Sequence, residues 1–330
     1  MYIIFMPIFL KNFIMSNLIM FTLFCMFFSD LFMIWFFLEI SNFLFITLMM
    51  MSMKNKHPIF FYFIIQMSSS LMMIMLFTTS NMSYFNHFFN EFLIIIIMML
   101  KLNIPPFHFW LPMIANHLPW IILLTMMTLQ KIIPFLMLSL FNLKSIIIYY
   151  ILLSCSLLPP MMIMKSKSIK TTMSYSSINQ MSWLSLINMF EPYLWLKYFI
   201  LYSFILLMLF KYFKETNISM NFKKFNYKFN DNKMTILTYF FMLTLAGMPP
   251  FSFFIMKWFV VYSLTFNMFF FSIMIIMIIS SLFMMYLYLN LMIFSLYFYK
   301  TKTKLYSYPS PYFMNTIFFL LFLTLIMLML

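Results

Sequence analysis

The sequence predicts an all-α polytopic membrane protein, and three observations support this fold class. The 330-residue chain is 65% hydrophobic and only 8% charged, whereas an average soluble protein carries about 25% charged residues. Its apolar runs are long enough to cross a bilayer, which takes about 20 residues. These runs follow one another from end to end. We therefore expect a single transmembrane domain over residues 1–330, with no soluble domain and no cleavable signal peptide.

About eleven transmembrane helices are predicted, each an apolar run bounded by polar residues or lysines. Asp30 separates the first two runs, Lys54 and Lys56 separate the next two, and Lys144 separates the fifth and sixth. Clusters of lysine precede the seventh, ninth and eleventh runs. The predicted spans are 12–28, 31–52, 59–79, 91–114, 118–141, 146–164, 172–190, 193–211, 234–265, 268–292 and 311–330.

The lysines are distributed unevenly between the two sides of the membrane that these spans define. Fifteen of the twenty lie at the N-terminus or in even-numbered loops, and only Lys144 and Lys197 lie in odd-numbered loops. The positive-inside rule therefore places the N-terminus and the even loops on the inner side, and an odd span count places the C-terminus on the other. The formal charge of +14 reflects this topology, so we expect no nucleic-acid partner.

Two short stretches of the chain repeat each other inside long apolar runs. Ile104-Pro105-Pro106-Phe107 returns as Met248-Pro249-Pro250-Phe251. A double proline removes backbone donors and breaks a helix, so the fourth and ninth spans are predicted to be discontinuous. Spans five apart cross the membrane in opposite directions, which is the geometry of an inverted repeat around a transport site.

Four ionisable side chains remain inside predicted spans: Glu39, Lys101, Lys131 and Lys257. A charged residue at the middle of a span costs roughly 2.5–3.5 kcal/mol on insertion scales, so it indicates a functional site by default. Burial disfavours a charged lysine and a neighbouring carboxylate favours it, so such a group can exchange a proton when nearby charges move. The alternatives are a structural ion pair for Glu39 and extension of the lysines to the membrane interface.

A secondary proton path is predicted at His108, Lys170, Tyr175 and Gln180. His108 follows the first break, and histidine titrates near neutral pH; equally, it could satisfy carbonyls freed by the break. The other three residues lie in Lys170–Gln180, an unusually polar stretch for a membrane segment. This stretch is either a hydrated path or a set of hydrogen bonds between helices.

Several classes of site are excluded by composition. Cys25 and Cys155 are far apart in the sequence, and four scattered histidines show no metal-ligand spacing, so we expect no metal site. Gly247 is the only glycine, which excludes the glycine-rich motifs that bind dinucleotides and ATP. The absence of arginine and the 42 methionines suggest an A+T-rich, organelle-encoded chain.

Five segments together resemble the family of mitochondrial NADH dehydrogenase (ubiquinone) subunit 2, an antiporter-like membrane-arm subunit of respiratory complex I. They occur in the family's order from the second to the ninth span. The segments are Trp35–Glu39, Lys101–Pro112, Gln130–Pro134, Tyr175–Trp183, and Gly247–Pro250 continuing to Lys257-Trp258.

The resemblance implies an antiporter-like fold with two inverted repeats, and it matches Glu39, Lys101, Lys131 and Lys257 to the family's proton path. It implies proton pumping across the mitochondrial inner membrane, with the N-terminus on the matrix side and the C-terminus on the intermembrane-space side. Partner subunits are then expected to bind NADH, FMN, iron–sulfur clusters and ubiquinone. No redox site and no bound cofactor are expected in this chain. The expected partners are other membrane-arm subunits, including neighbouring antiporter-like ones, and membrane lipids such as cardiolipin.

The sequence departs from the family pattern at a few positions, and two other functions stay open. Asn103, Ser182 and Phe253 stand where glycine is usual, and Gln180 stands where histidine is common. Because glutamine cannot titrate, proton transfer at that position would need water on either side. The alternatives are a stand-alone cation/proton antiporter of related fold and a structural spacer subunit with inert ion pairs.

Overall fold

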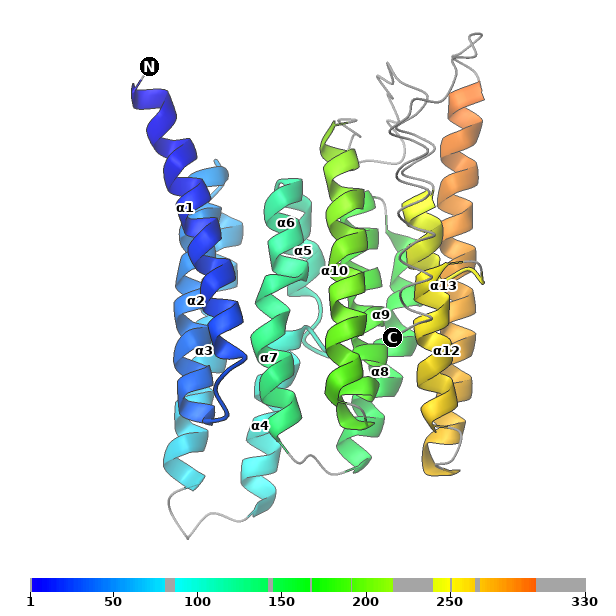
Figure 1. Cartoon of the computed structure of the whole chain (residues 1–330), viewed down its shortest axis with the longest axis horizontal. Coiled ribbons are helices and arrows are strands. Elements are labelled where there is room, and N and C mark those ends of the chain that lie inside the picture. Colours follow the sequence, from blue (N-terminus) through cyan, green and yellow to red (C-terminus); the bar gives the residue numbers. More distant parts are fainter. Residues whose placement is uncertain are drawn as a thin grey trace. The chain divides into compact units, whose positions relative to one another are not determined.

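The computed structural model of the chain describes residues 2–80, 87–141, 145–166, 168–190, 192–215, 240–249, 251–264 and 268–300. The secondary-structure elements in these ranges are α-helices (Figure 1). Chain contacts divide the protein into two compact units, residues 1–154 and 155–330. Each unit is described separately below. The predicted single domain over 1–330 therefore stays a prediction.

Seven of the described helices lie wholly within the first unit, and they pack mainly on neighbours in the sequence. Figure 1 shows α1, α2 and α3 side by side, and α2 also contacts α7, which packs in turn on α4. The elements are α1 (Tyr2–Cys25), α2 (Leu31–Ser52), α3 (His57–Ser80), α4 (His87–Leu102), α5 (Trp110–His117), α6 (Trp120–Met127) and α7 (Leu129–Leu140). The first unit therefore brings α2, α4 and α7 together, and these helices carry Glu39, Lys101 and Lys131.

The second unit contains longer helices in a simple succession of contacts. Helix α9 packs on α10, α10 on α12, and α12 on α13. Helix α8 crosses the boundary between the units, and residues 240–246 form a further helical segment. The elements are α8 (Ser145–Lys165), α9 (Ile169–Phe190), α10 (Pro192–Glu215), α12 (Ser252–Leu264) and α13 (Met268–Lys300).

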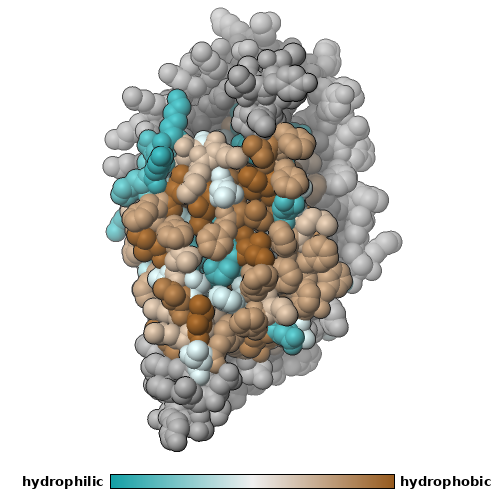
Figure 2. Space-filling view, turned by 90° about the vertical axis from the view of Figure 1, so that its left-hand side faces the viewer, coloured by the Kyte–Doolittle hydropathy of each residue, from teal (hydrophilic) through white to brown (hydrophobic). Residues whose placement is uncertain are grey.

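The chain is a membrane protein. Within the described residues, five helical segments are long and apolar enough to cross a bilayer: Leu31–Ser52, His57–Thr78, Trp120–Leu140, Leu194–Lys214 and Phe271–Leu291. Large apolar side chains such as Phe36 and Ile64 are half exposed on the first unit. Figure 2 shows one face of the structure as mostly hydrophobic, with its largest hydrophilic group at the upper edge. Such a surface suits lipid rather than water.

Most helix bounds follow the predicted spans closely, but α13 ends at Lys300, eight residues beyond the predicted end at 292, and three further differences are found. The first helix begins ten residues before its predicted start at residue 12. The span predicted as continuous over 118–141 is interrupted at Thr128, between α6 and α7. Lys170, which the lysine count places in a loop, lies in the first turn of α9 and is 2% exposed.

Some of the predicted features lie outside the described residues. This group contains the eleventh span at 311–330, Pro250, and most of the lysine-rich segment from Lys211 to Lys233 that precedes the ninth span. The number of membrane crossings therefore stays a prediction.

The two proline-containing repeats end their helices with the same backbone geometry. Asn103 and Gly247 both adopt a positive φ, 61° and 76°, the left-handed conformation that commonly ends a helix. The amide of the next residue then bonds to the carbonyl five residues earlier, Ile104 to Met99 at 3.0 Å and Met248 to Leu243 at 3.4 Å. The repeat in sequence is thus also a repeat in local structure.

The similarity extends to the turn that follows. Phe107 donates its backbone N–H to the Ile104 carbonyl and Phe251 donates to Met248, each at 3.0 Å. Residues 103–109, 247–249 and 251 are not helical, and α5 and α12 begin directly after these segments. A helical segment therefore stops and a second one starts at each of the two sites.

Candidate functional site

An ion pair between α2 and α4 is the centre of the site in the first unit. The ammonium Nζ of Lys101 lies 3.5 Å from Oε1 of Glu39, and the two side chains are 1% and 13% exposed. Lys101 occupies the last turn of α4, where the helix carbonyls favour a positive charge. Because neither charge is well hydrated, each lowers the cost of burying the other.

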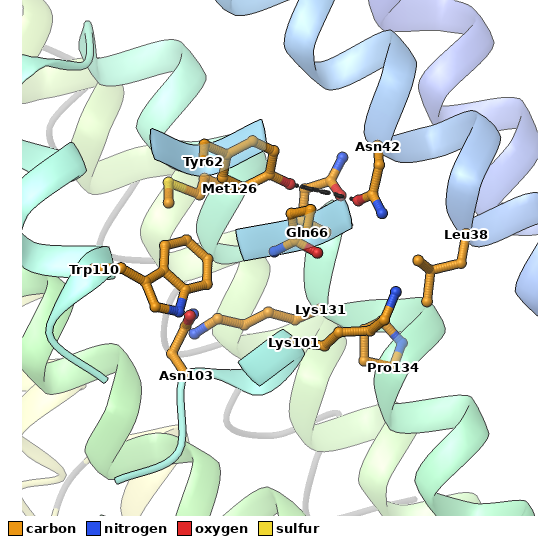
Figure 3. A pocket seen from close by; sticks show the side chains of 11 residues that line it. Leu38, Asn42, Tyr62, Gln66, Lys101, Asn103, Trp110, Met126, Lys131 and Pro134 are labelled. Atoms are coloured by element: carbon orange, nitrogen blue, oxygen red, sulfur yellow. Dashed lines mark hydrogen bonds between the residues drawn. The ribbon is translucent and has the colours of Figure 1, made fainter. Parts of the chain in front are cut away.

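Lys101 and Lys131 line one small cavity of about 10 Å³. That volume is close to the minimum that holds one water molecule. In Figure 3 the Lys131 side chain extends toward Asn103 and Trp110, and Lys131 is 1% exposed. The lining residues are Leu38, Asn42, Tyr62, Gln66, Lys101, Asn103, Trp110, Met126, Gln130, Lys131 and Pro134.

Polar side chains connect the helices around this cavity. The Tyr62 hydroxyl on α3 lies 3.5 Å from both Oδ1 of Asn42 and Oε1 of Gln130, at the outer limit of a hydrogen bond. Gln130 also donates Nε2–H to the Ser41 carbonyl on α2 at 3.2 Å. The ring of Tyr62 packs against Trp110 with centroids 5.8 Å apart. These contacts fix α7 against α2 and α3 beside the lysines.

The interruption at Thr128 determines where Lys131 lies. Thr128 has φ −116° and ψ −81°, and its hydroxyl and its amide both donate to the Leu124 carbonyl, at 2.8 and 3.0 Å. The amide of Lys131 bonds to the Thr128 carbonyl, 2.9 Å away. Pro134 in the same helix lacks an N–H donor. The backbone around Lys131 therefore departs from a regular α-helix on both sides of that residue.

In the second unit, the ammonium of Lys257 lies among aromatic rings and next to the only glycine. Its Nζ is 5.4 Å from the ring centroid of Trp183 and 5.6 Å from that of Phe253, within the range of cation–π attraction. A Cβ atom at Gly247 would lie 3.3 Å from the same Nζ. Lys257 is 8% exposed, so aromatic faces replace part of its hydration.

Helix α9 carries an unusual number of buried polar side chains. Gln180 accepts a hydrogen bond from the Tyr198 hydroxyl on α10 at 2.8 Å, and both side chains are buried. Several serines donate instead to carbonyls three residues earlier in α9, for example Ser177 to Ser174. Lys170 is buried ten residues before Gln180, which is about 15 Å along a helix. Tyr175, between them, is only partly buried.

The structure therefore brings together three of the four principal residues that the sequence predicts. Glu39, Lys101 and Lys131 meet in the first unit. Lys257 belongs to the second unit with Lys170, Tyr175 and Gln180. His108 is 2% exposed, in the non-helical segment between α4 and α5, and it does not line the cavity. The role of each of these residues stays a prediction.

Sequence reasoning missed the neutral polar side chains around the two lysines. Asn42, Tyr62 and Gln66 lie in the second and third predicted spans, and because they are neutral they do not mark a site as a charged residue does. An amide inside an apolar run is also costly unless it is hydrogen-bonded, so Asn42 and Gln66 could have been recognised from the sequence as candidate site residues. Tyr198, the partner of Gln180, could not, because tyrosine is common throughout this chain.

The arrangement is suited to moving a proton between ionisable groups. Carboxylate and amine side chains such as Glu39, Lys101 and Lys131 are chemically able to hold or release a proton, and both lysines line a cavity of water size. Within the described ranges, no three histidine, cysteine or acidic residues gather as metal ligands would. The cysteines Cys25 and Cys155 are both free and buried.

Residues 28–284 match the family described as NADH:quinone oxidoreductase/Mrp antiporter, transmembrane region. The chain belongs to this family. The match runs from the loop before α2 into α13, so it includes Glu39, Lys101, Lys131 and Lys257. A resemblance carried by five short segments is thus confirmed over most of the chain.

The chain is also similar to curated proteins that are named NADH-ubiquinone oxidoreductase chain 2. The one from Aedes aegypti is 36% identical over 172 residues, which cover 50% of this chain and 48% of that protein. The one from Anopheles gambiae is 34% identical over 170 residues, 51% and 49% of the two chains. The chain spans about half the length of the curated relatives it matches.

Solved structures show the antiporter-family fold. A chain of respiratory complex I from Thermus thermophilus aligns with a TM-score of 0.70 and 16% identity, covering 90% of this chain and 72% of that one. A chain of the Mrp complex from Dietzia sp. aligns with a TM-score of 0.67 and 13% identity, covering 79% and 56%. The predicted all-α, antiporter-like fold class is confirmed at this level.

Proposed function

We propose that this chain is a proton-translocating membrane subunit of respiratory complex I, working in the mitochondrial inner membrane. The buried Glu39–Lys101 pair beside Lys131 is the observation that carries the proposal, together with the names of the curated relatives. The chain would act as part of an NADH:ubiquinone reductase and carry no redox group itself. NADH oxidation and quinone reduction would take place on other subunits, including those that carry FMN and iron–sulfur clusters.

The proposed fold has two inverted repeats, each containing one discontinuous transmembrane helix. The matching helix ends at Asn103 and Gly247 support this arrangement. Helix α4 followed by α5 would form the first discontinuous helix, and residues 240–246 followed by α12 would form the second. The two units would then join in one transmembrane domain over residues 1–330, with the N-terminus on the matrix side and the C-terminus on the intermembrane-space side.

The proposed path uses the two lysines as alternating proton carriers. When the Glu39 carboxylate is close, it stabilises the charged form of Lys101. If the carboxylate becomes protonated or moves, the buried ammonium loses that stabilisation and passes a proton through the small cavity to Lys131. Lys257 would then exchange protons with the far side or with a neighbouring antiporter-like subunit. His108, Lys170, Tyr175 and Gln180 would lie along secondary parts of this path.

Energy for this movement would have to come from outside the chain. Moving one charge against the membrane potential costs about 2.3 kcal/mol for each 100 mV. Because of this cost, a change in a partner subunit would supply the trigger at Glu39. Neighbouring membrane-arm subunits and membrane lipids such as cardiolipin are accordingly the proposed partners.

The test is replacement of Lys131 by methionine in the assembled complex, with proton pumping and quinone reduction measured together. Methionine keeps much of the side-chain volume and removes the titratable group. We expect pumping to fall by at least about tenfold, as for loss of a proton-transfer group, while the complex remains assembled. Lys197→Met, a lysine of α10 outside the path, is the matched control and should leave both activities unchanged.

Normal pumping in an assembled Lys131→Met complex would rule out the relay and favour a structural spacer. A stand-alone cation/proton antiporter is the other candidate, because the family and one aligned structure include Mrp antiporters. Reconstitution of the chain alone in vesicles separates these candidates. Cation-driven proton flux by the isolated chain would favour the antiporter.

A further inference from the structure

An apolar groove opens between α2 and α3 on the surface of the first unit. Its volume is about 690 Å³, and Phe43 and Met50 of α2 face Phe60 and Phe63 of α3 across it. Met50 is 61% exposed and Phe60 is 64% exposed. The lining is almost wholly apolar, with Lys56 as its one charged residue. A groove of this size lies within the range of small-molecule sites, about 300–1,000 Å³.

A basic hollow of about 480 Å³ adjoins this groove at the loop between α2 and α3. It is lined by Lys54, Lys56, His57 and His117, together with Asn55 and Pro58, and no carboxylate contributes to its lining. Lys56 lines both the hollow and the groove. A cationic surface is thus continuous with an apolar one, and a single side chain joins them.

We propose that these two hollows form one binding site for an anionic phospholipid. The phosphate would lie in the basic hollow, between Lys54 and Lys56, and an acyl chain would lie in the groove against Phe43, Met50 and Phe60. Basic pockets at the ends of membrane helices are the sites that anionic headgroups select, and each buried methylene of the acyl chain adds to binding. An anionic phospholipid suits both hollows, because it joins a negatively charged headgroup to apolar acyl chains.

The charge pattern separates this site from the rest of the lipid-facing surface. Exposed apolar side chains are common on the first unit, and any acyl chain can cover them. The combination of a concave apolar surface and four basic or titratable residues at its mouth predicts selection by headgroup charge. Figure 2 shows hydrophilic side chains gathered at the upper edge of this largely hydrophobic face. None of the residues of the site lines the cavity of Lys101 and Lys131, so the site is separate from the proposed proton path, and the inference rests on the proposed function only in taking a membrane lipid as a partner.

The test uses the full chain in nanodiscs of phosphatidylcholine and phosphatidylglycerol in a 4:1 ratio. Spin labels on the acyl chain of either lipid report the fraction that the protein immobilises. The Lys54→Gln/Lys56→Gln variant removes the headgroup charge, and Lys211→Gln/Lys214→Gln removes the same charge from two exposed lysines of α10. Thr47→Trp places a large ring in the groove, because Thr47 is an exposed part of its lining.

For the wild-type chain we expect an immobilised component that prefers phosphatidylglycerol. The preference should fall about fivefold for each of Lys54 and Lys56 removed and stay unchanged in the α10 control. Thr47→Trp should reduce the immobilised fraction of both lipids. Helix content measured by circular dichroism checks each fold, and Thr47→Trp carries the test if the double-lysine variant fails to fold.

Equal lipid preference in the Lys54/Lys56 and Lys211/Lys214 variants would overturn the proposal. The same conclusion would follow if Thr47→Trp left the immobilised lipid unchanged. Inorganic phosphate provides the last distinction. If it abolished the preference while Thr47→Trp had no effect, the basic hollow would be an anion site without an acyl chain.

Discussion

Lys101 Nζ lies 3.5 Å from Glu39 Oε1, and this ion pair joins α4 to α2 in the interior of the first unit. The lysine is almost fully buried, so removing its partner leaves a charge with little hydration. Replacing both residues removes that problem together with the pair. The stability of the chain should therefore depend on whether one or both partners are removed.

We predict that Glu39→Gln destabilises the chain more than the double variant Glu39→Gln/Lys101→Met does. Breaking a buried pair from one side typically costs about 3–5 kcal/mol, whereas replacing both partners is often close to neutral. Thermal unfolding in detergent of the unmodified chain, Glu39→Gln, Lys101→Met and the double variant measures this difference. Additive effects of the two substitutions would show that the pair contributes no coupling energy.

The left-handed conformation of Asn103 predicts a preference for glycine at this position. Asn103→Gly should be neutral or stabilising, because glycine adopts positive φ without a steric cost. Asn103→Ala should be less stable than Asn103→Gly by about 1–2 kcal/mol. Both variants lose the amide side chain, so their difference isolates the backbone effect. Equal unfolding temperatures for the two variants would contradict the assigned conformation.

Gly247→Ala should disturb Lys257 in two separable ways. Alanine at φ +76° is strained, and its Cβ would lie 3.3 Å from Lys257 Nζ, which forces the ammonium to shift. Combining Gly247→Ala with Lys257→Met removes the contact with Nζ and keeps the backbone strain, which costs about 1–2 kcal/mol. Unfolding of the single and double variants separates the two effects. If Gly247→Ala lowers the free energy of unfolding by the same amount with and without the lysine ammonium, the contact between the alanine Cβ and Lys257 Nζ has no effect on stability.

Removal of the Tyr198 hydroxyl should weaken the contact between α9 and α10. In Tyr198→Phe, the side-chain oxygen Oε1 of Gln180 loses its hydrogen-bond donor. For a buried group this loss lowers the free energy of unfolding by about 1–3 kcal/mol. Tyr286→Phe, at a tyrosine that is 54% exposed on α13, is the control and should change stability little. Proton pumping of the assembled complex tests whether Gln180 also belongs to the path. Retained pumping in a folded Tyr198→Phe complex would restrict this pair to a structural role.

Helix positions were largely predictable because apolar runs and lysines mark the ends of membrane segments. The predicted span 31–52 coincides with α2, and 146–164 and 193–211 differ from α8 and α10 by a few residues. Thr128 was not predictable as an interruption, because threonine and methionine occur within regular membrane helices. Pro105-Pro106 was predictable, because no helix interior accommodates two consecutive prolines easily.

Burial of particular polar groups was only partly predictable. The lysine distribution predicts a loop position for Lys170, because a lysine beside polar residues looks the same in sequence whether it faces water or the protein interior. The helix that begins at Ile169 buries it. Gln130 belongs to a segment that resembles the family, but its contacts with Ser41 and Tyr62 depend on how α7 lies against α2 and α3.

The sequence by itself determined that this protein is a membrane-spanning bundle of helices. It also determined where two of the helices end, at the repeated prolines, and that Glu39, Lys101, Lys131 and Lys257 are buried charges. Those properties follow from local composition and from the cost of placing charge or unpaired backbone groups in an apolar medium. Only the tertiary structure decided that Glu39 pairs with Lys101, that Lys131 shares a cavity with Lys101, and that Lys257 lies against Trp183 and Gly247. Partners far apart in the chain are selected by helix packing, which a pattern of apolar residues does not specify.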